Sequence, residues 1–530
     1  MTGWNREFNG FQWNGSNYSS GPVYGILNQT SSSHNLTVFT LNQSMIFDVG
    51  AGAINFTNGG QSQLNGHGLT IHGNGGSFTM AGSTASSAAG GSFTVEAGVA
   101  HVAVGGPIGT AGGNVTILGD GTGSFNGANL AGGNFIIDGN RSTTHGTQTF
   151  NTGGGDFLVN GTANHTFNGQ LLTGGGDFIW TVNGNGQFNN NINAAGGQIR
   201  FEGSGNLTFA NPVQTTTLNG DIFIGGSQNV TFQNTITTNG GGITFGDGAT
   251  VNAQNTINTG GGAINVVGTA NVTTSNTINT GGGDINVTSS GDFTASGNIN
   301  TNGGSIYVTG DGDTALTGWV NTADGDIYLT GNGTTFLNND PTLGTGEIIV
   351  IGGGTLVLDA DGTGSNTGST RINVLLEGGT FRTAGKERYI GTLTLSTDSR
   401  IDMGTTGSSL MDINTFASIN DFNPWNEFSL ITIENFTVGG DTIRFNSGSG
   451  VVGNEQFFRF EGDYGQGLGI YYATLQDMGG GVFHLTPGEL DVIIIPEPGT
   501  VALGGMLLLA AVFHFWRRRR SVLADQSVDS

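Results

Sequence analysis

Residues 255–266 read NTINTGGGAINV and residues 276–287 read NTINTGGGDINV, so eleven of twelve letters recur when the numbering shifts by 21. The repeat continues on both sides when each copy is anchored on the apolar residue that follows the glycine run. The spacing of successive anchors varies only from 20 to 23, and the last six intervals are all 21. The anchors are Phe93, Val115, Phe135, Phe157, Phe178, Ile199, Ile222, Ile243, Ile264, Ile285, Ile306, Ile327 and Ile348.

Each copy shows the alternation of β-strands. Apolar residues stand at the anchor and two residues after it, as in Ile285 and Val287, with a free position between them. A second apolar pair follows eight and ten residues past the anchor, and a third inward residue fourteen past it. In the longest copy, which begins at Ile199, we expect this third residue to be Val213. The two extra residues of that copy are expected in a turn between Val213 and Ile222.

Glycine stands two residues before every anchor, and we expect a corner with positive φ there. Three short strands per ~21 residues predict one coil of a parallel β-helix, since stacked coils bury an apolar face that one coil cannot. The predicted fold is therefore all-β, a single-stranded parallel β-helix (solenoid) with ~4.8 Å between coils. Equal residues then stack in columns that share hydrogen bonds along the axis. The expected columns are Asn258, Asn279, Asn300 and Asn321, and Thr259, Thr280, Thr301 and Thr322.

The extent of the ~21-residue repeat, together with the composition of its flanks, divides the chain into five parts. We expect an irregular β N-terminal part or cap over 1–92, the regular β-helix over 93–371, and a C-terminal β section with a cap over 372–490. A motif with a transmembrane helix and an arginine cluster follows over 491–520, and a cytoplasmic tail over 521–530.

Composition excludes several classes of function. The chain of 530 residues carries a formal net charge of −24, and four of its 14 basic residues are adjacent in the tail. Phosphate neutralisation needs Lys and Arg, so a nucleic-acid-binding function is excluded. With no cysteine there is neither a disulfide framework nor a thiolate metal site. The 100 glycines follow no Gly-X-Y period, so the chain is not a collagen.

The tail reads VIIIPEPGTVALGGMLLLAAVFHFWRRRR over residues 492–520. The apolar run Val501–Trp516 predicts a short transmembrane helix, with the flanking residues covering the rest of the bilayer core. The positive-inside rule keeps Arg517–Arg520 in the cytoplasm and the body outside. The alternative is a buried core helix, against which four adjacent arginines argue.

The tail resembles the PEP-CTERM sorting signal. Pro496, Glu497 and Pro498 match its motif, Val501–Trp516 its membrane segment, and Arg517, Arg518, Arg519 and Arg520 its basic stop. The resemblance implies an exported protein of a bacterium that makes extracellular polysaccharide or a complex envelope. It also implies processing by an exosortase-type membrane protease as partner. The section from about Arg388 to Asp491 resembles the end of such proteins with autotransporter-type β-strand repeats.

The first twenty residues show no charged region followed by an apolar one. We therefore expect the export signal to lie upstream of this sequence.

The sequence offers little material for catalysis. No Lys, Arg, His or Cys occurs from Phe201 to Thr370, whereas polysaccharide lyases and hydrolases need clustered carboxylates, often with a basic partner. A hydrolase with two carboxylates alone stays open, although the regular coils offer no long loops to build its groove. We assign structural roles to the aspartates directly before anchors, and no catalytic residue: Asp156, Asp177, Asp221, Asp284 and Asp326.

We assign no metal and no cofactor. Asp359–Thr370 starts like an EF-hand loop but lacks its later ligands, and residues 310–313, GDGD, resemble a single calcium-binding nonapeptide. His67 and His72 have no third ligand. No Gly-Lys-Ser/Thr follows the glycine runs, which excludes a phosphate-binding loop.

The sequence therefore favours a non-enzymatic, exported, surface-anchored or released β-helical rod with a structural or adhesive role in the envelope or the extracellular polysaccharide matrix. Two alternatives remain: a β-helical polysaccharide lyase or hydrolase, and an autotransporter-like passenger, which would end in a barrel of ~12 strands.

Overall fold

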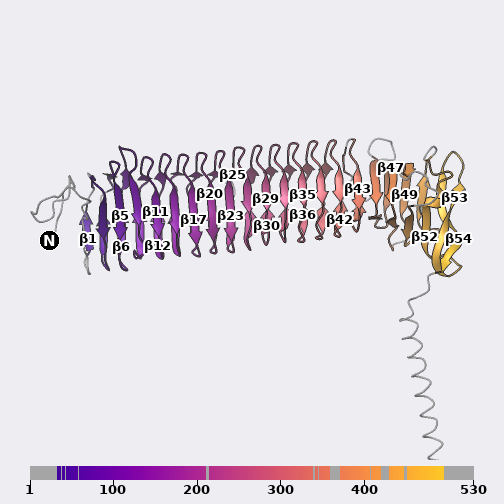
Figure 1. Ribbon diagram of the computed structural model, residues 1–530, viewed down its shortest axis with the longest axis horizontal. Helices are drawn as coiled ribbons and strands as arrows, with labels where there is room; N and C mark the ends of the chain where they lie inside the picture. Colours follow the sequence, from indigo (N-terminus) through magenta and orange to yellow (C-terminus); the bar gives the residue numbers. More distant parts are fainter. Residues whose placement is uncertain are drawn as a thin grey trace, which may run out of the picture.

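The computed structural model describes residues 33–493 apart from 37–38, 42, 58, 211–213, 338, 340, 344, 359–370, 406–407, 419–428 and 447–449. These residues form one long rod of stacked coils (Figure 1). A typical coil contains β32 (Ile264–Val266), β33 (Asn271–Thr274) and β34 (Ile278–Asn279), and each of these strands pairs in parallel with its counterpart in the next coil. The predicted parallel β-helix with three short strands per coil is confirmed.

The anchor sheet contains the strand that begins each copy of the repeat. Its members pair in chain order, in parallel up to β51. They are β2 (Met45–Asp48), β5 (Gly68–His72), β8 (Ser92–Val95), β11 (Val115–Leu118), β14 (Phe135–Asp138), β17 (Phe157–Gly161), β20 (Phe178–Val182), β23 (Ile199–Gly203), β26 (Ile222–Ile224), β29 (Ile243–Phe245), β32 (Ile264–Val266), β35 (Ile285–Val287), β38 (Ile306–Val308), β41 (Ile327–Leu329), β43 (Ile348–Ile351), β45 (Ile372–Glu377), β47 (Glu387–Thr397), β49 (Leu410–Ser418), β51 (Thr442–Phe445) and β54 (Phe483–Ile493).

The second sheet lies beside it and follows one turn later in each coil. Its strands are β1 (Ser33–Leu36), β3 (Ala53–Phe56), β6 (Ser77–Met80), β9 (His101–Val104), β12 (Gly121–Phe125), β15 (Arg141–His145), β18 (His165–Phe167), β21 (Gly186–Phe188), β24 (Asn206–Phe209), β27 (Asn229–Phe232), β30 (Thr250–Ala253), β33 (Asn271–Thr274), β36 (Phe293–Ala295), β39 (Thr314–Leu316), β42 (Thr334–Leu337), β44 (Thr355–Leu358), β46 (Thr380–Arg382), β48 (Ser399–Asp402), β50 (Ile431–Glu434), β52 (Phe458–Asp463) and β53 (Leu468–Asp477).

The third sheet is built from very short strands and stops before the C-terminal section. Its strands are β4 (Gln61–Gln63), β7 (Ser83–Ala85), β10 (Ile108–Gly109), β13 (Ala128–Asn129), β16 (Phe150–Asn151), β19 (Leu171–Leu172), β22 (Ile192–Asn193), β25 (Gln214–Thr216), β28 (Thr235–Thr237), β31 (Ile257–Asn258), β34 (Ile278–Asn279), β37 (Ile299–Asn300) and β40 (Val320–Asn321).

The thirteen anchors form a single inward column. Consecutive anchors are direct register partners from Phe93 to Ile348, and each is at most 1% exposed. The apolar residue two positions later is likewise buried in every copy, for example Trp180 and Val287. The period-2 pattern therefore predicted the core correctly, because alternate side chains of a strand point to opposite faces.

Aromatic stacking fills the core beside the second sheet. The rings of Phe167, Phe188, Phe209 and Phe232 follow one another at centroid distances of 5.2, 4.7 and 4.3 Å. Their planes differ by no more than 11°. In-register coils place equal side chains one above another, so an apolar position becomes a continuous stack.

The glycine before each anchor differs from the prediction. In one coil this residue is Gly262, which has no positive φ, and the left-handed conformations belong to Gly260 (φ 65°) and Gly261 (φ 120°). A Cβ atom on Gly262 would lie 2.0 Å from the carbonyl oxygen of Gly241 in the preceding coil. Glycine stands there because two backbones touch, and not because φ is positive.

The register of the longest copy also corrects the prediction. Ile192 pairs with Thr215, and Thr215 pairs with Ile236, so Thr215 and not Val213 takes the inward place of the third sheet. The Thr215 hydroxyl is fully buried and accepts a hydrogen bond from Asn234 Nδ2 at 2.9 Å. The two extra residues consequently fall between Phe209 and Gln214 in the chain, on the other side of the third strand.

Coils extend beyond the regular repeat at both ends. Upstream, β2, β5 and β8 already pair in parallel. Downstream, β43 pairs with β45, and two-strand coils continue to β51 and β52. An antiparallel hairpin then closes this end, since β53 pairs with β52 while β54 pairs with β51. The hairpin joins the anchor sheet to the second sheet.

The described chain contains one helical turn, η1 (Glu455–Phe457), and within it no helix has the length and apolar character needed to cross a membrane. The expected transmembrane segment Val501–Trp516 lies outside the described residues.

Candidate functional site

Polar columns hold successive coils together, as predicted for Asn and Thr. Asn279 Nδ2 donates to Asn258 Oδ1 at 2.9 Å, and Asn300 Nδ2 donates to Asn279 Oδ1 at 2.9 Å. The fourth expected member, Asn321, instead accepts from the Ala323 N–H. The threonine column is fully buried, and the Thr259 hydroxyl donates to the Thr280 carbonyl at 3.1 Å.

The aspartates that precede anchors serve the same purpose. Asp156 Oδ1 accepts the backbone N–H of Asp177 at 2.9 Å, and Asp221 Oδ1 that of Gly242 at 2.7 Å. Asp177, Asp284 and Asp326 each accept from the corresponding residue of the next coil. One carboxylate oxygen of each aspartate thus accepts a hydrogen bond from the neighbouring coil.

The calcium-like phrase at residues 310–313 belongs to similar columns. Asp313 Oδ1 accepts the Thr334 N–H at 3.0 Å, and Asp311 Oδ1 accepts from Asn332 Nδ2 at 2.9 Å. Over the described ranges no three His, Cys, Asp or Glu side chains gather as a metal site. The other loop, Asp359–Thr370, lies outside these ranges. His72 Nδ1 lies 2.5 Å from Glu96 Oε2, and this hydrogen bond raises the pKa of His72.

A polar cluster lies inside the core and was not predicted. The Thr143 hydroxyl lies 2.6 Å from His145 Nε2 and 2.7 Å from His165 Nδ1. His145 is fully buried and stacks on Phe167 with centroids 4.0 Å apart. His145 therefore occupies a place in the phenylalanine stack, one coil before Phe167. That substitution in an otherwise aromatic position is the signal that sequence reasoning overlooked.

Arg141 enters the core on the same strand as Thr143 and His145. Its guanidinium donates to the carbonyl oxygens of Thr122 at 2.9 Å and Leu118 at 3.3 Å, and also to that of Val99. These carbonyls belong to the two preceding coils, so Arg141 links three coils from within. Burial lowers the pKa of Arg141.

Burial governs the electrostatics of this cluster. Desolvation, and secondarily the nearness of His165, holds the pKa of His145 well below its ordinary value. Desolvation lowers the pKa of His165 to about 4. Both imidazoles are therefore neutral at pH 7. His145 Nδ1 and His165 Nε2 have no hydrogen-bond partner among the described atoms.

A second cluster crosses the C-terminal strands as a row on their outer face. Arg371 stands just before β45, and the row continues through Tyr389, Asp412, Arg444 and His484 on successive strands. It runs from the two-strand coils into the antiparallel hairpin. No pattern in the sequence pointed to this row, because its members follow one another at unequal intervals and belong to no repeat.

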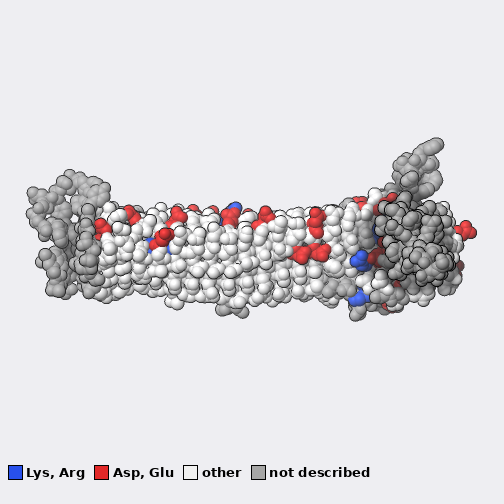
Figure 2. Space-filling view, turned by 90° about the horizontal axis from the view of Figure 1, so that it is seen from below, with Lys and Arg blue, Asp and Glu red and all other residues white. Residues whose placement is uncertain are grey.

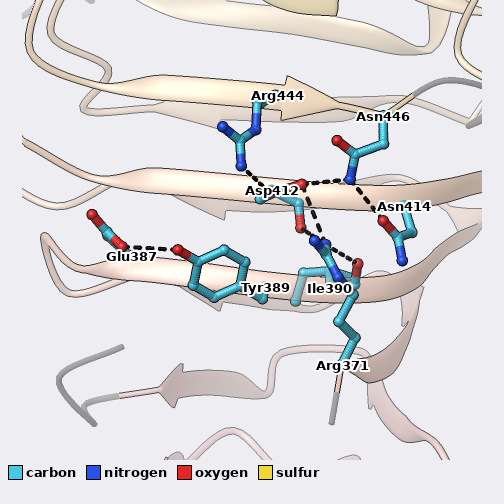
Figure 3. A network of polar contacts seen from close by, with 8 residues as sticks. All are labelled: Arg371, Glu387, Tyr389, Ile390, Asp412, Asn414, Arg444 and Asn446. Atoms are coloured by element: carbon cyan, nitrogen blue, oxygen red, sulfur yellow. Dashed lines mark hydrogen bonds and ion pairs between the residues drawn. The ribbon is translucent and has the colours of Figure 1, made fainter. Parts of the chain in front are cut away.

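Asp412 is the centre of this row (Figure 3). Its Oδ1 lies 3.2 Å from Arg371 Nη1 and accepts from Asn446 Nδ2 at 2.8 Å, while Oδ2 pairs with Arg444 Nη2. The Arg371 guanidinium lies 5.4 Å from the centre of the Tyr389 ring. Only 1% of the Asp412 side chain is exposed.

The arginines decide the charge of Asp412. Burial alone would raise the pKa of its carboxyl, but hydrogen bonds and attraction from Arg444 and Arg371 hold that pKa below its usual value. Asp402 is held similarly, with its pKa also lowered, by Asn435, the Gly404 N–H and Arg382. Carboxylates that are ionised, covered and fully paired suit a structural clamp and not a proton donor.

Charge is segregated on the regular coils. Between the eighth and the sixteenth position past each anchor, no Asp, Glu, Lys or Arg occurs in the ten copies from Val115 to Ile306. The outward side chains of this stretch form the outer side of the second and third sheets, which we call the neutral face. Figure 2 shows the corresponding contrast, with carboxylates lined along one edge of the rod and wide uncharged surface beside them.

The predicted sorting residues Pro496, Glu497 and Pro498 and the stop Arg517–Arg520 lie outside the described residues. Comparison with protein-family models and with curated proteins finds no match to either.

Proposed function

We propose that the chain is a non-enzymatic rod that is exported and works as a structural or adhesive element of the cell envelope or the extracellular polysaccharide matrix. The observation that carries this proposal is the use made of its polar side chains. Asn, Thr and Asp side chains of the repeat bond from coil to coil along the axis. Such a design produces length and stiffness, because every coil is hydrogen-bonded and packed to both neighbours.

Export rests on the resemblance of the tail to a PEP-CTERM signal. In this proposal Pro496–Pro498 and Arg517–Arg520 flank a membrane segment, an exosortase-type protease processes the tail, and the body reaches the outside.

A polysaccharide lyase or hydrolase is the second candidate, and the Asp412 cluster is the observation in its favour. It brings an acid together with two arginines, as charge-stabilising sites do. However, both oxygens of Asp412 are occupied and its side chain is 1% exposed, which leaves no room for a substrate. The geometry therefore supports a structural role better than a catalytic one.

Two measurements test the proposal. Fractionation of cells that express the chain behind an added N-terminal signal, with and without residues 491–530, should find the intact protein outside the cytoplasm and the truncated one not retained at the membrane. Purified protein incubated with neutral and acidic polysaccharides should release no new reducing ends. If turnover appears and a single Asp or Glu substitution abolishes it, the enzymatic candidate replaces ours.

A further inference from the structure

The neutral face presents an outward row of threonines along the second sheet. Nine residues past the anchor, outward residues stack in register across eight coils of the second sheet. Six are threonines whose hydroxyls form no hydrogen bond within the described part of the chain. They are Thr144, Thr166, Thr208, Thr231, Thr273 and Thr294.

The inward threonine column behaves differently. Thr238 and Thr259, for example, each donate to a carbonyl oxygen of the next coil at 3.1 Å. The buried column therefore holds the rod together, whereas the outward row leaves its hydroxyls free for another molecule. Because the coils stack in register, the side chains of this row recur every ~4.8 Å along the axis, with Gln187 and Asn252 in the two coils that have no threonine there.

We propose that this face binds an uncharged polysaccharide chain that lies along the rod. The inference rests on the proposed adhesive function and names its ligand class and its surface. Hydroxyl and amide side chains both donate and accept, which matches the hydroxyl groups of a sugar polymer.

Charge selects among the possible occupants. The chain carries a net charge of −24, so a polyanion is repelled along the whole rod. A polycation would be drawn to the carboxylates, which lie away from this face. A second copy would bring two strongly acidic bodies together. An uncharged polymer meets none of these penalties.

An exposed tryptophan marks one end of the face. Trp319 is 64% exposed and lies thirteen residues past the anchor Ile306, in the turn between the second and third strands of that coil. Its backbone N–H donates to Asn298 Oδ1 at 3.1 Å, which fixes its place beside the preceding coil. The indole offers an apolar ring face to the C–H groups of a sugar in the coil that follows Thr294, the last threonine of the row.

Binding to such a surface depends on polymer length. Each hydrogen bond to an exposed hydroxyl replaces one to water and contributes little alone. Many equal contacts on one chain add through effective concentration, so a polymer binds where a short oligosaccharide does not.

Electrophoresis of the full chain through native gels tests the proposal. The gels contain hydroxyethylcellulose, galactomannan or, as the anionic comparison, alginate. The face variant is T166E/T208E/T273E, whose positions are separated by at least one unchanged coil. The control T116E/T244E/N286E adds the same charge to the outer side of the anchor sheet. Thermal unfolding of all three proteins checks that they fold.

We expect a neutral polymer to retard the wild type and the control but not the face variant, and alginate to retard none. W319A should weaken the retardation by roughly fivefold, the value of one aromatic contact. Equal retardation of face variant and control would overturn the assignment of this face while leaving adhesion in place. Retardation by alginate alone, or by no polymer, would overturn the neutral-polysaccharide inference. Release of reducing ends would instead overturn the proposed function itself.

Discussion

Gly262 stacks on Gly241 of the preceding coil so closely that a Cβ atom on Gly262 would lie 2.0 Å from the Gly241 carbonyl oxygen. The same approach recurs at the next copy, where a Cβ atom on Gly283 would lie 2.2 Å from the Gly262 carbonyl oxygen. At this corner the rod is therefore a column of backbone on backbone. A side chain there must push two coils apart.

Gly262→Ala should destabilise the rod by about 3 kcal/mol or more, because backbone atoms and not a flexible side chain must move. The matched control is Gly260→Asn. Gly260 has φ 65°, and the equivalent positions Asn239 and Ala195 carry side chains in the same conformation. The control should cost about 1–2 kcal/mol, the ordinary cost of the left-handed conformation, and so less than Gly262→Ala. Hydrogen exchange of the surrounding strands measures the destabilisation caused by each variant. Equal protection in the two variants would contradict the inference that close backbone contact requires glycine at position 262.

Asp412→Asn should cost about 3–5 kcal/mol, because it leaves two partly buried arginines without their carboxylate. Asp221→Asn is the control. Asp221 is exposed and uses one oxygen to accept the Gly242 N–H, which an amide oxygen also accepts. It should change stability by less than about 0.5 kcal/mol. Denaturant unfolding, followed by hydrogen exchange in β47, β49 and β51, compares the two. A mild effect of Asp412→Asn would show that the row is not a clamp.

The buried histidines should make the rod sensitive to mild acid. Their pKa values are lower in the folded chain than in the unfolded chain, to about 4 for His165. As pH falls from 6.5 to 4, the unfolded chain binds protons that the folded chain does not. The free energy of unfolding therefore falls through this window, by about 3 kcal/mol for His165, and levels off below it. The pKa values of Asp412 and Asp402 are also lowered by folding. Their contribution to the free energy of unfolding is therefore lost only as the pH falls below about 3.8.

His145→Phe isolates this effect, since Phe fits the aromatic stack between Phe125 and Phe167. The Thr143 hydroxyl keeps His165 as partner. Unfolding measured at several pH values should lose stability less steeply between pH 6.5 and 4 in the variant. The same slope in both proteins would exclude His145 as a source of the acid sensitivity.

The tail proposal separates retention from processing. Replacing Arg517–Arg520 with Ser should let full-length protein pass outward, because a cationic cluster resists translocation. Replacing Pro496–Pro498 with Ala should keep the protein in the membrane but block its cleavage, since Pro holds the backbone extended for a protease. Immunoblots of cell fractions from a host with an exosortase, with an added N-terminal signal, compare the variants. Equal processing of wild type and Ala variant would leave a plain membrane anchor.

The sequence by itself determined the coil. Equal residues 21 apart predicted the stacking, and the alternation around Ile285 predicted which side chains face inward. Both signals are repetitive, so every copy reports the same physical requirement. The Asn258–Asn279 bond follows from the same rule.

Other features were decided only by the tertiary structure. A glycine in the sequence can be required by a positive φ or by the lack of room for a Cβ atom, and the sequence does not say which. The close contact with Gly241 shows that the second reason applies to Gly262. Strand pairing placed Thr215 inward although Val213 is the more apolar choice. The pairs Thr143–His165 and Arg371–Asp412 each occur once, so no repeated pattern in the sequence predicts them. They depend on which coils lie next to each other, and that is set by packing and register, not by any local preference of the chain.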